Sequence, residues 1–190
     1  MIGVRRGARS IRDRVAQGDD ERRSEWRQDI NGASALARFD RDVLSQSGVK
    51  WLVLLEGIND IGRGATIPAE AVTAEDLIFA HKQIIQRAHA HGIRVIGATL
   101  TPYEGAAYYR EEGEAVRQAL NTWIRSSGAY DAVADFDAAT RDPANPRRIR
   151  AEFDPGDHLH PNDAGYQAMA GAIDLAIFTG RRAMAAPAKR

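Results

Sequence analysis

Two histidines lie close to acidic residues in one short segment near the end of the chain. In "DPGDHLHPNDAGY", residues 154–166, Asp157 comes three positions before His160. This spacing lets the carboxylate reach the imidazole within one turn and fix its tautomer and orientation. A histidine held in this way can act as a general base. We therefore predict that Asp157 and His160 form a catalytic pair.

Two other interpretations of this segment stay open. Asp157 and His160 also fit a polar surface turn, with Asp157 acting only as a loop or cap residue. Alternatively, Asp157, His158 and His160 could bind a metal, although zinc needs three good ligands, each with its own hydrogen-bonded support. No further cluster of histidines accompanies them in the sequence. We expect neither a metal nor a cofactor.

A second polar pair follows an apolar run in "LLEGIND", residues 54–60. An asparagine at the end of a strand, here Asn59, can donate its side-chain NH2 to a developing oxyanion, an interaction worth about 3 kcal/mol. Gly57 would allow a close backbone approach beside it. The alternative is an Asx turn that leaves the strand.

The positions of these segments depend on the elements around them. Continuous apolar runs predict three strands, at 49–55, 93–100 and 130–136. Helices between them imply right-handed crossovers and a parallel sheet. The segments at 54–60 and 154–166 then lie at the carboxyl edge of the sheet, where such folds place their sites.

Capping residues and apolar spacing predict the helices. Ser34 is the expected N-cap of the first, and Thr73 with Asp76 forms a capping box for the second, which Gly92 ends. A third helix ends at Gly128, and Pro161 with Asn162 opens a fourth. The core-facing stripe expected on this last helix consists of Tyr166, Met169, Ala170, Ile173 and Ile177.

Composition limits the possible functions. The 190 residues are 44% hydrophobic, enough for one domain over 1–190. The 26 acidic and 26 basic residues balance, so no overall field favours nucleic acid or an anionic membrane. The absence of cysteine excludes disulfides and thiolate catalysis. Without an apparent signal peptide or membrane span, the chain as written is expected to be soluble and cytoplasmic, although its localisation stays open.

The two polar segments described first, one after an apolar run and one near the end of the chain, resemble conserved blocks of the SGNH (GDSL) hydrolases. "LLEGINDIG" is similar to the third conserved block of that family, and "DPGDHLHPNDAGYQAMA" to the fifth, over a similarity that spans roughly 34–178. The resemblance implies a flavodoxin-like three-layer α/β/α sandwich. It also implies that Asn59 is an oxyanion donor, that His160 is the general base, and that Asp157 orients it.

The first two family blocks are not intact here. The family nucleophile is the serine of a Gly-Asp-Ser sequence, and its nearest counterpart is Ser10 in "GARSIRD", where Arg9 replaces the aspartate. The other interpretation of Ser10 is a serine in a polar, arginine-rich arm. Residues 1–33 are therefore expected to be atypical, with incomplete N-terminal strands, and 181–190 to be a flexible tail.

An incomplete N-terminal strand would leave the strand at 49–55 without a neighbour on one side. Exposed strand edges pair with other chains. We therefore expect either that the N-terminal segment covers this edge poorly, or that the protein forms a homodimer or aggregates through it.

Two functions are compatible with the sequence. The first is a serine ester hydrolase acting on a small-molecule acyl or acetyl ester, with a carbohydrate-linked ester among the candidate substrates. The second is a pseudoenzyme or fragment that keeps a ligand-binding pocket.

Other residues with functional chemistry receive mainly structural interpretations. His81, His89 and His91, on or after one helix, are expected to be solvated at the surface. Tyr103, Tyr108 and Tyr109 follow the strand at 93–100 and either line a substrate cleft or pack ordinarily.

Overall fold

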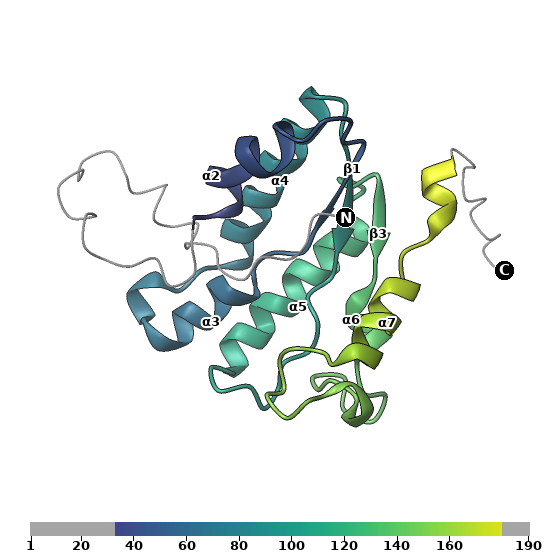
Figure 1. Cartoon of the computed structure of the whole chain (residues 1–190). Helices are drawn as coiled ribbons and strands as arrows, with labels where there is room; N and C mark the ends of the chain where they lie inside the picture. Colours follow the sequence, from purple (N-terminus) through teal and green to yellow (C-terminus); the bar gives the residue numbers. More distant parts are fainter. Residues whose placement is uncertain (1–32, 180–190) are drawn as a thin grey trace, which may run out of the picture.

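The computed structural model describes residues 33–179, and its centre is a parallel sheet. Strands β1 (Trp51–Leu54), β2 (Arg94–Ala98) and β3 (Ala132–Ala134) lie in the order β1-β2-β3 (Figure 1). Each falls inside a predicted strand, so the predicted alternation of strands and helices is confirmed. The expectations for 1–32 and for 181–190 lie outside the described residues.

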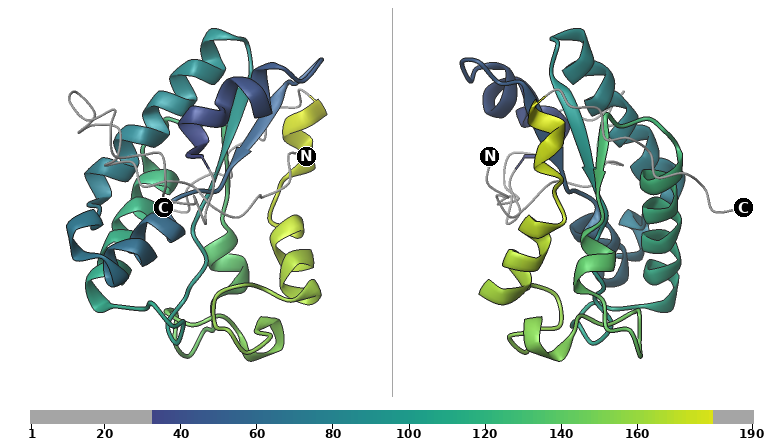
Figure 2. Two further views of the ribbon diagram at one scale, coloured as in Figure 1. Left: turned by 60° about the vertical axis from the view of Figure 1, so that its left-hand side comes forward. Right: turned by 90° about the vertical axis from the view of Figure 1, so that its right-hand side faces the viewer.

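Helices cover both faces of this sheet, as Figure 2 shows from two sides. One face carries α2 (Ala35–Phe39), α3 (Ile58–Thr66), α4 (Ala74–Ala90) and α5 (Glu111–Ser126), and the other carries α6 (Phe136–Thr140) and α7 (Asp163–Gly171). A π-helix at Asp40–Leu44 extends α2, and short 3-10 helices occupy Pro68–Glu70, Ala151–Phe153 and Leu175–Thr179. The three layers confirm the predicted fold class.

Strand β2 shows how the two faces are separated. Val95 packs into the core beneath α4 and α5, whereas Ile96 and Ala98 pack into a second core with Phe136 and Met169. Neighbouring residues of a strand point to opposite faces, so a strand covered on both faces reads as a continuous apolar run. None of the helices in the described part of the chain is long and apolar enough to cross a membrane.

Three helix starts form as their sequences predict. The Ser34 hydroxyl accepts a hydrogen bond from the backbone N–H of Ala37 at 3.3 Å. Thr73 and Asp76 form a complete capping box at the start of α4. The Asn162 side chain accepts from the N–H of Gly165 at 3.1 Å and caps α7. These local bonds satisfy N–H groups that have no partner within the helix.

The predicted stripe on the last helix is partly wrong. Helix α7 ends at Gly171, and Tyr166 is 51% exposed. The buried positions are Gly165 and Met169. A Cβ on Gly165 would lie 2.7 Å from Cβ of Pro161. The missing side chain therefore lets this face of α7 approach its neighbours, which turns Tyr166 outward.

The sequence did not predict α3, because glycines interrupt its helical pattern. A Cβ on Gly62 would lie 2.7 Å from the Tyr108 ring, and one on Gly64 would lie 2.7 Å from Cα of Ala71. Close contacts with other segments therefore require glycine at both positions.

The expectation for His81 is also wrong. His81 is 2% exposed and lies on the buried face of α4 with Leu77, Ile84 and Ala88. Spacings of four, three and four residues place all four side chains on one side of the helix. The same periodicity was visible in the sequence, but the polarity of histidine favoured a surface position.

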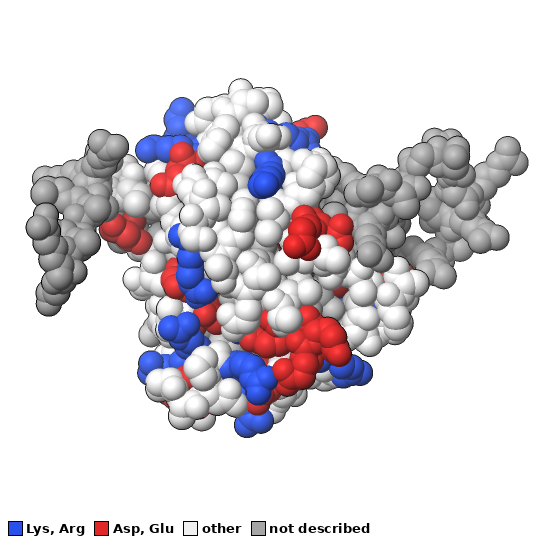
Figure 3. All heavy atoms as spheres, turned by 180° about the vertical axis from the view of Figure 1, so that it is seen from behind, with Lys and Arg blue, Asp and Glu red and all other residues white. Residues whose placement is uncertain are grey.

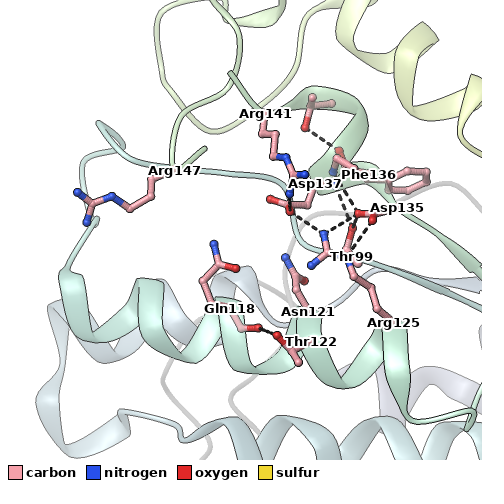
Figure 4. Close-up of polar contacts among 12 residues, drawn as sticks. Thr99, Gln118, Asn121, Thr122, Arg125, Asp135, Phe136, Asp137, Arg141 and Arg147 are labelled. Atoms are coloured by element: carbon pink, nitrogen blue, oxygen red, sulfur yellow. Dashed lines mark hydrogen bonds and ion pairs between the residues drawn. The ribbon is translucent and has the colours of Figure 1, made fainter. Parts of the chain in front are cut away.

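A buried network of charges joins α5 to the ends of β2 and β3. Arg117 is fully buried and donates two hydrogen bonds to Glu114, at 2.8 and 2.7 Å. It also donates to Asp137 at 2.7 Å and to the carbonyl of Leu100 at 2.9 Å. Figure 4 shows the neighbouring part of the network, in which Arg125 bridges Asp135 and Asp137. The carboxylates thus compensate the buried guanidinium.

Replacing Arg117 by Met should destabilise the protein by about 3–5 kcal/mol, because it leaves Glu114 and Asp137 buried without this partner. The measurement is the free energy of unfolding in urea. Arg41→Met, which removes an exposed arginine whose partner Asp42 keeps its bond to Arg38, should leave the midpoint nearly unchanged. Equal midpoints for the two variants would contradict this account of the core.

Candidate active site

The turn between β1 and α3 positions the first candidate residues. Gly57 has φ of +123°, a conformation that L side chains rarely adopt, and a Cβ there would lie 3.3 Å from Cδ2 of Leu120. Asn59 follows in the first turn of α3, slightly beyond the strand tip at which the sequence placed it. Its side chain is half-buried, and within residues 33–179 it has no hydrogen-bond partner. Within this part of the chain, the amide is therefore not used to hold the fold.

The structure brings Asp157 and His160 together, as their spacing predicted. Nδ1 of His160 lies 2.5 Å from Oδ2 of Asp157. The other oxygen, Oδ1, accepts from the backbone N–H groups of Leu159 and His160 at 3.0 and 2.9 Å. The 40% exposure of the His160 side chain leaves the ring accessible.

These bonds keep Asp157 ionised and select the ring nitrogen that donates to it. Desolvation raises the pKa of Asp157, but the hydrogen bonds from the His160 ring and from the two amides outweigh it and lower the pKa to about 2. The carboxylate is thus ionised at neutral pH and can only accept, so Nδ1 of His160 carries the proton. Nε2 of neutral His160 then holds a free lone pair, which is the requirement for a general base.

A second pair of the same kind precedes the first. Nδ1 of His158 lies 2.5 Å from Oδ2 of Asp154, and His158 has φ of +59°. The spacing of four residues between Asp154 and His158 is the sequence signal for this pair. Each histidine binds its own carboxylate. No group of three potential metal ligands occurs among residues 33–179.

Tyr108 connects the two segments of the site. Its ring lies against Gly62 of α3. Burial, together with the negative charge of Asp157, raises the Tyr108 pKa to about 12. The loop after β2 therefore approaches both the Asn59 helix and the Asp157 turn. Tyr103, in contrast, is fully buried and packs in the core.

The same loop also contacts the histidine turn directly. A Cβ on Gly105, which has φ of +105°, would lie 2.9 Å from Cγ of His158. In Figure 1, α3 and the loop leading into α7 lie toward the same end of the sheet. On the face shown in Figure 3, acidic and basic side chains lie near one another. The candidate nucleophile Ser10 lies outside the described residues.

The three-layer α/β fold and the Asp157–His160 pair can be compared with known proteins. The model of the GDSL-like lipase/acylhydrolase family matches residues 3–168. The chain therefore belongs to this family of ester hydrolases. The match begins before Ser10 and includes Gly57, Asn59, Asp157 and His160.

Solved structures confirm the fold. A GDSL-like lipase from Bacteroides thetaiotaomicron is 22% identical, with a TM-score of 0.63 over 78% of this chain and 74% of that one. A putative acylhydrolase from Bacteroides fragilis is 20% identical, with a TM-score of 0.62 over 78% and 73%. A catalytic mutant of an acetylxylan esterase from Geobacillus stearothermophilus is 21% identical, with a TM-score of 0.54 over 75% and 68%. A search of curated proteins found no match.

Replacing Gly57 by Ala should destabilise the protein by about 1–3 kcal/mol, because alanine is strained at this φ. Gly171→Ala is the matched control: a Cβ there meets nothing within 4 Å, and the change should stabilise the helix end by up to about 1 kcal/mol. Thermal unfolding of both variants measures the difference. A Gly57→Ala protein as stable as the parent would show that the turn does not need glycine.

Proposed function

We propose that the protein is a serine ester hydrolase that works through an acyl-enzyme. The observation that carries the proposal is the Asp157–His160 pair, in which Nε2 of His160 is left as a base. Asn59 supports it, because its amide is unpaired within residues 33–179 and α3 meets the same tyrosine loop as Asp157. No step of this mechanism needs a metal or a cofactor.

The proposed nucleophile is Ser10. Its Oγ attacks the acyl carbon while Nε2 of His160 takes the hydroxyl proton, and Asp157 stabilises the resulting imidazolium. The Asn59 amide donates to the oxyanion of the tetrahedral intermediate. Collapse expels the alcohol, which takes the proton from His160. Water then attacks the acyl-enzyme, His160 accepts its proton and returns it to Ser10, and the carboxylic acid leaves.

The proposed substrate is a small neutral ester, and carbohydrate-linked acetyl esters are one candidate class. One solved structure with this fold is an acetylxylan esterase. The balanced charge of the chain provides no overall attraction for a highly charged substrate. The alternative is a pseudoenzyme, in which the His160 pair and Asn59 bind a ligand without a presented nucleophile.

Labelling with a fluorophosphonate probe tests the mechanism, with the adduct located by mass spectrometry. We expect a label on Ser10 that Ser10→Ala abolishes and His160→Ala reduces by at least about 100-fold, because the base is lost. His158→Asn is the matched control, since asparagine tolerates a positive φ and the Asp157 pair stays intact. Chelator should change nothing. A folded sample in which no serine is labelled would contradict this mechanism and favour the pseudoenzyme.

We also propose that two copies associate through β1. Among the described strands β1 pairs only with β2, which leaves its other edge without a strand, and Val53 on it is 36% exposed. Unpaired N–H and C=O groups on an apolar strand favour pairing with another chain.

Solution scattering should show a dimer, and Val53→Lys should shift it to monomer because a charged edge resists pairing. Val133→Lys, on the shorter strand β3 at the other side of the sheet, is the control and should leave the dimer intact. A monodisperse, thermally stable monomer in the unmodified protein would contradict the proposal.

A further inference from the structure

His81 is a buried titratable residue that the proposed mechanism does not use. Its Nε2 lies 3.2 Å from the carbonyl oxygen of Glu56, and its Nδ1 lies 2.5 Å from the hydroxyl of Tyr130. Glu56 is the residue directly before Gly57, in the turn that leads to Asn59. His81 of α4 thus links Tyr130, next to β3, to the turn that carries the candidate oxyanion donor Asn59.

The partners fix the direction of both hydrogen bonds. A carbonyl oxygen can only accept, so Nε2 of His81 carries the proton. In the neutral ring Nδ1 then accepts, and the Tyr130 hydroxyl donates to it. Burial lowers the pKa of His81 to about 4, against the smaller opposing effect of the bond to Glu56, and burial raises the pKa of Tyr130. Both groups are therefore neutral near pH 7, and the chain of bonds runs from Tyr130 through His81 to the backbone.

The bond to Glu56 restrains more than one atom. A peptide unit is planar and almost always trans, so fixing the carbonyl of Glu56 also fixes the N–H of Gly57, which points the opposite way. Gly57 is the N-cap of α3 and has an unusual φ of +123°, so the direction of the helix depends on this peptide plane. The Glu56 side chain is held separately by Arg38 at 2.8 Å.

We infer that His81 and Tyr130 are positioning residues, which hold the Glu56–Asn59 turn so that the Asn59 amide meets the oxyanion. The inference rests on the proposed role of Asn59. Neither His81 nor Tyr130 touches the substrate. The alternative is that His81 is a structural core histidine, whose two hydrogen bonds only compensate the burial of its ring nitrogens. That interpretation predicts a loss of stability without a selective effect on the turn or on the chemical step.

Two substitutions of His81 separate these interpretations. Gln places an amide N–H close to the position of Nε2 and keeps a donor for Glu56, whereas Leu removes it. We expect hydrogen exchange in peptides covering 55–62 to rise at least about tenfold in His81→Leu and to stay near the parent in His81→Gln. Tyr130→Phe, which keeps the ring against Gly97, should show the same local rise to a smaller extent.

Kinetics on an activated ester provide the second measurement. Asn59 acts in the transition state, so His81→Leu should lower kcat by about 10–100-fold with KM within about twofold, and His81→Gln should restore kcat. The inference is overturned if exchange in 55–62 rises no more than in the rest of α4 and β3, or if kcat is unchanged in His81→Leu. If His81→Leu does not fold, Tyr130→Phe decides by the same two criteria, and His81→Gln is the control expected to match the parent.

The two proposals fail in different ways. An unmodified protein without esterase activity or a labelled serine would refute the serine mechanism, and the exchange data would still decide whether His81 holds the turn. An active protein in which substitution of His81 changes neither hydrogen exchange at 55–62 nor kcat would refute the positioning role alone.

Discussion

The arrangement of the site depends on how buried carbonyl groups beyond the strand ends find donors. A parallel strand pairs its carbonyls only along its ladder, and a chain that leaves the sheet inside the core must find other partners. After β1, the carbonyl of Glu56 meets the ring of His81 on α4. After β2, the carbonyl of Leu100 accepts from Arg117 and Asn121 on α5. In both cases, the donor comes from a long helix, α4 or α5, that packs on the same face of the sheet.

These bonds place the loops that carry the candidate chemistry. The bond at Glu56 acts on the turn into α3 and Asn59. The bonds at Leu100 fix the beginning of the loop that brings Tyr108 against α3 and Gly105 against His158. This loop therefore connects the Asn59 helix to the Asp157–His160 turn. The buried side chains of α4 and α5 act on separate loops that meet above the same sheet edge.

Much of this arrangement was predictable from local sequence. The capping residues Ser34, Thr73 and Asn162 mark helix starts through bonds that span only three residues, so no tertiary information is needed. The Asp157–His160 pair is local for the same reason. The predictions that failed depend on packing. Helix α3 contains glycines because Tyr108 and Ala71 lie against it. Tyr166 is exposed because Gly165 faces the core.

The polar residues inside the core are the positions whose burial the hydrophobic pattern of the sequence does not predict. Arg117 and His81 occupy positions that helical periodicity assigns to the core, next to Leu120 and Leu77 respectively, and their polarity argues for the surface. Burial of such groups is tolerable only with partners already in place. Those partners, Asp137 and Tyr130 among them, are 20 and 49 residues away in sequence. In this chain, both polar residues also donate to a distant backbone carbonyl, and the two carbonyls lie beyond the strand ends next to the candidate site.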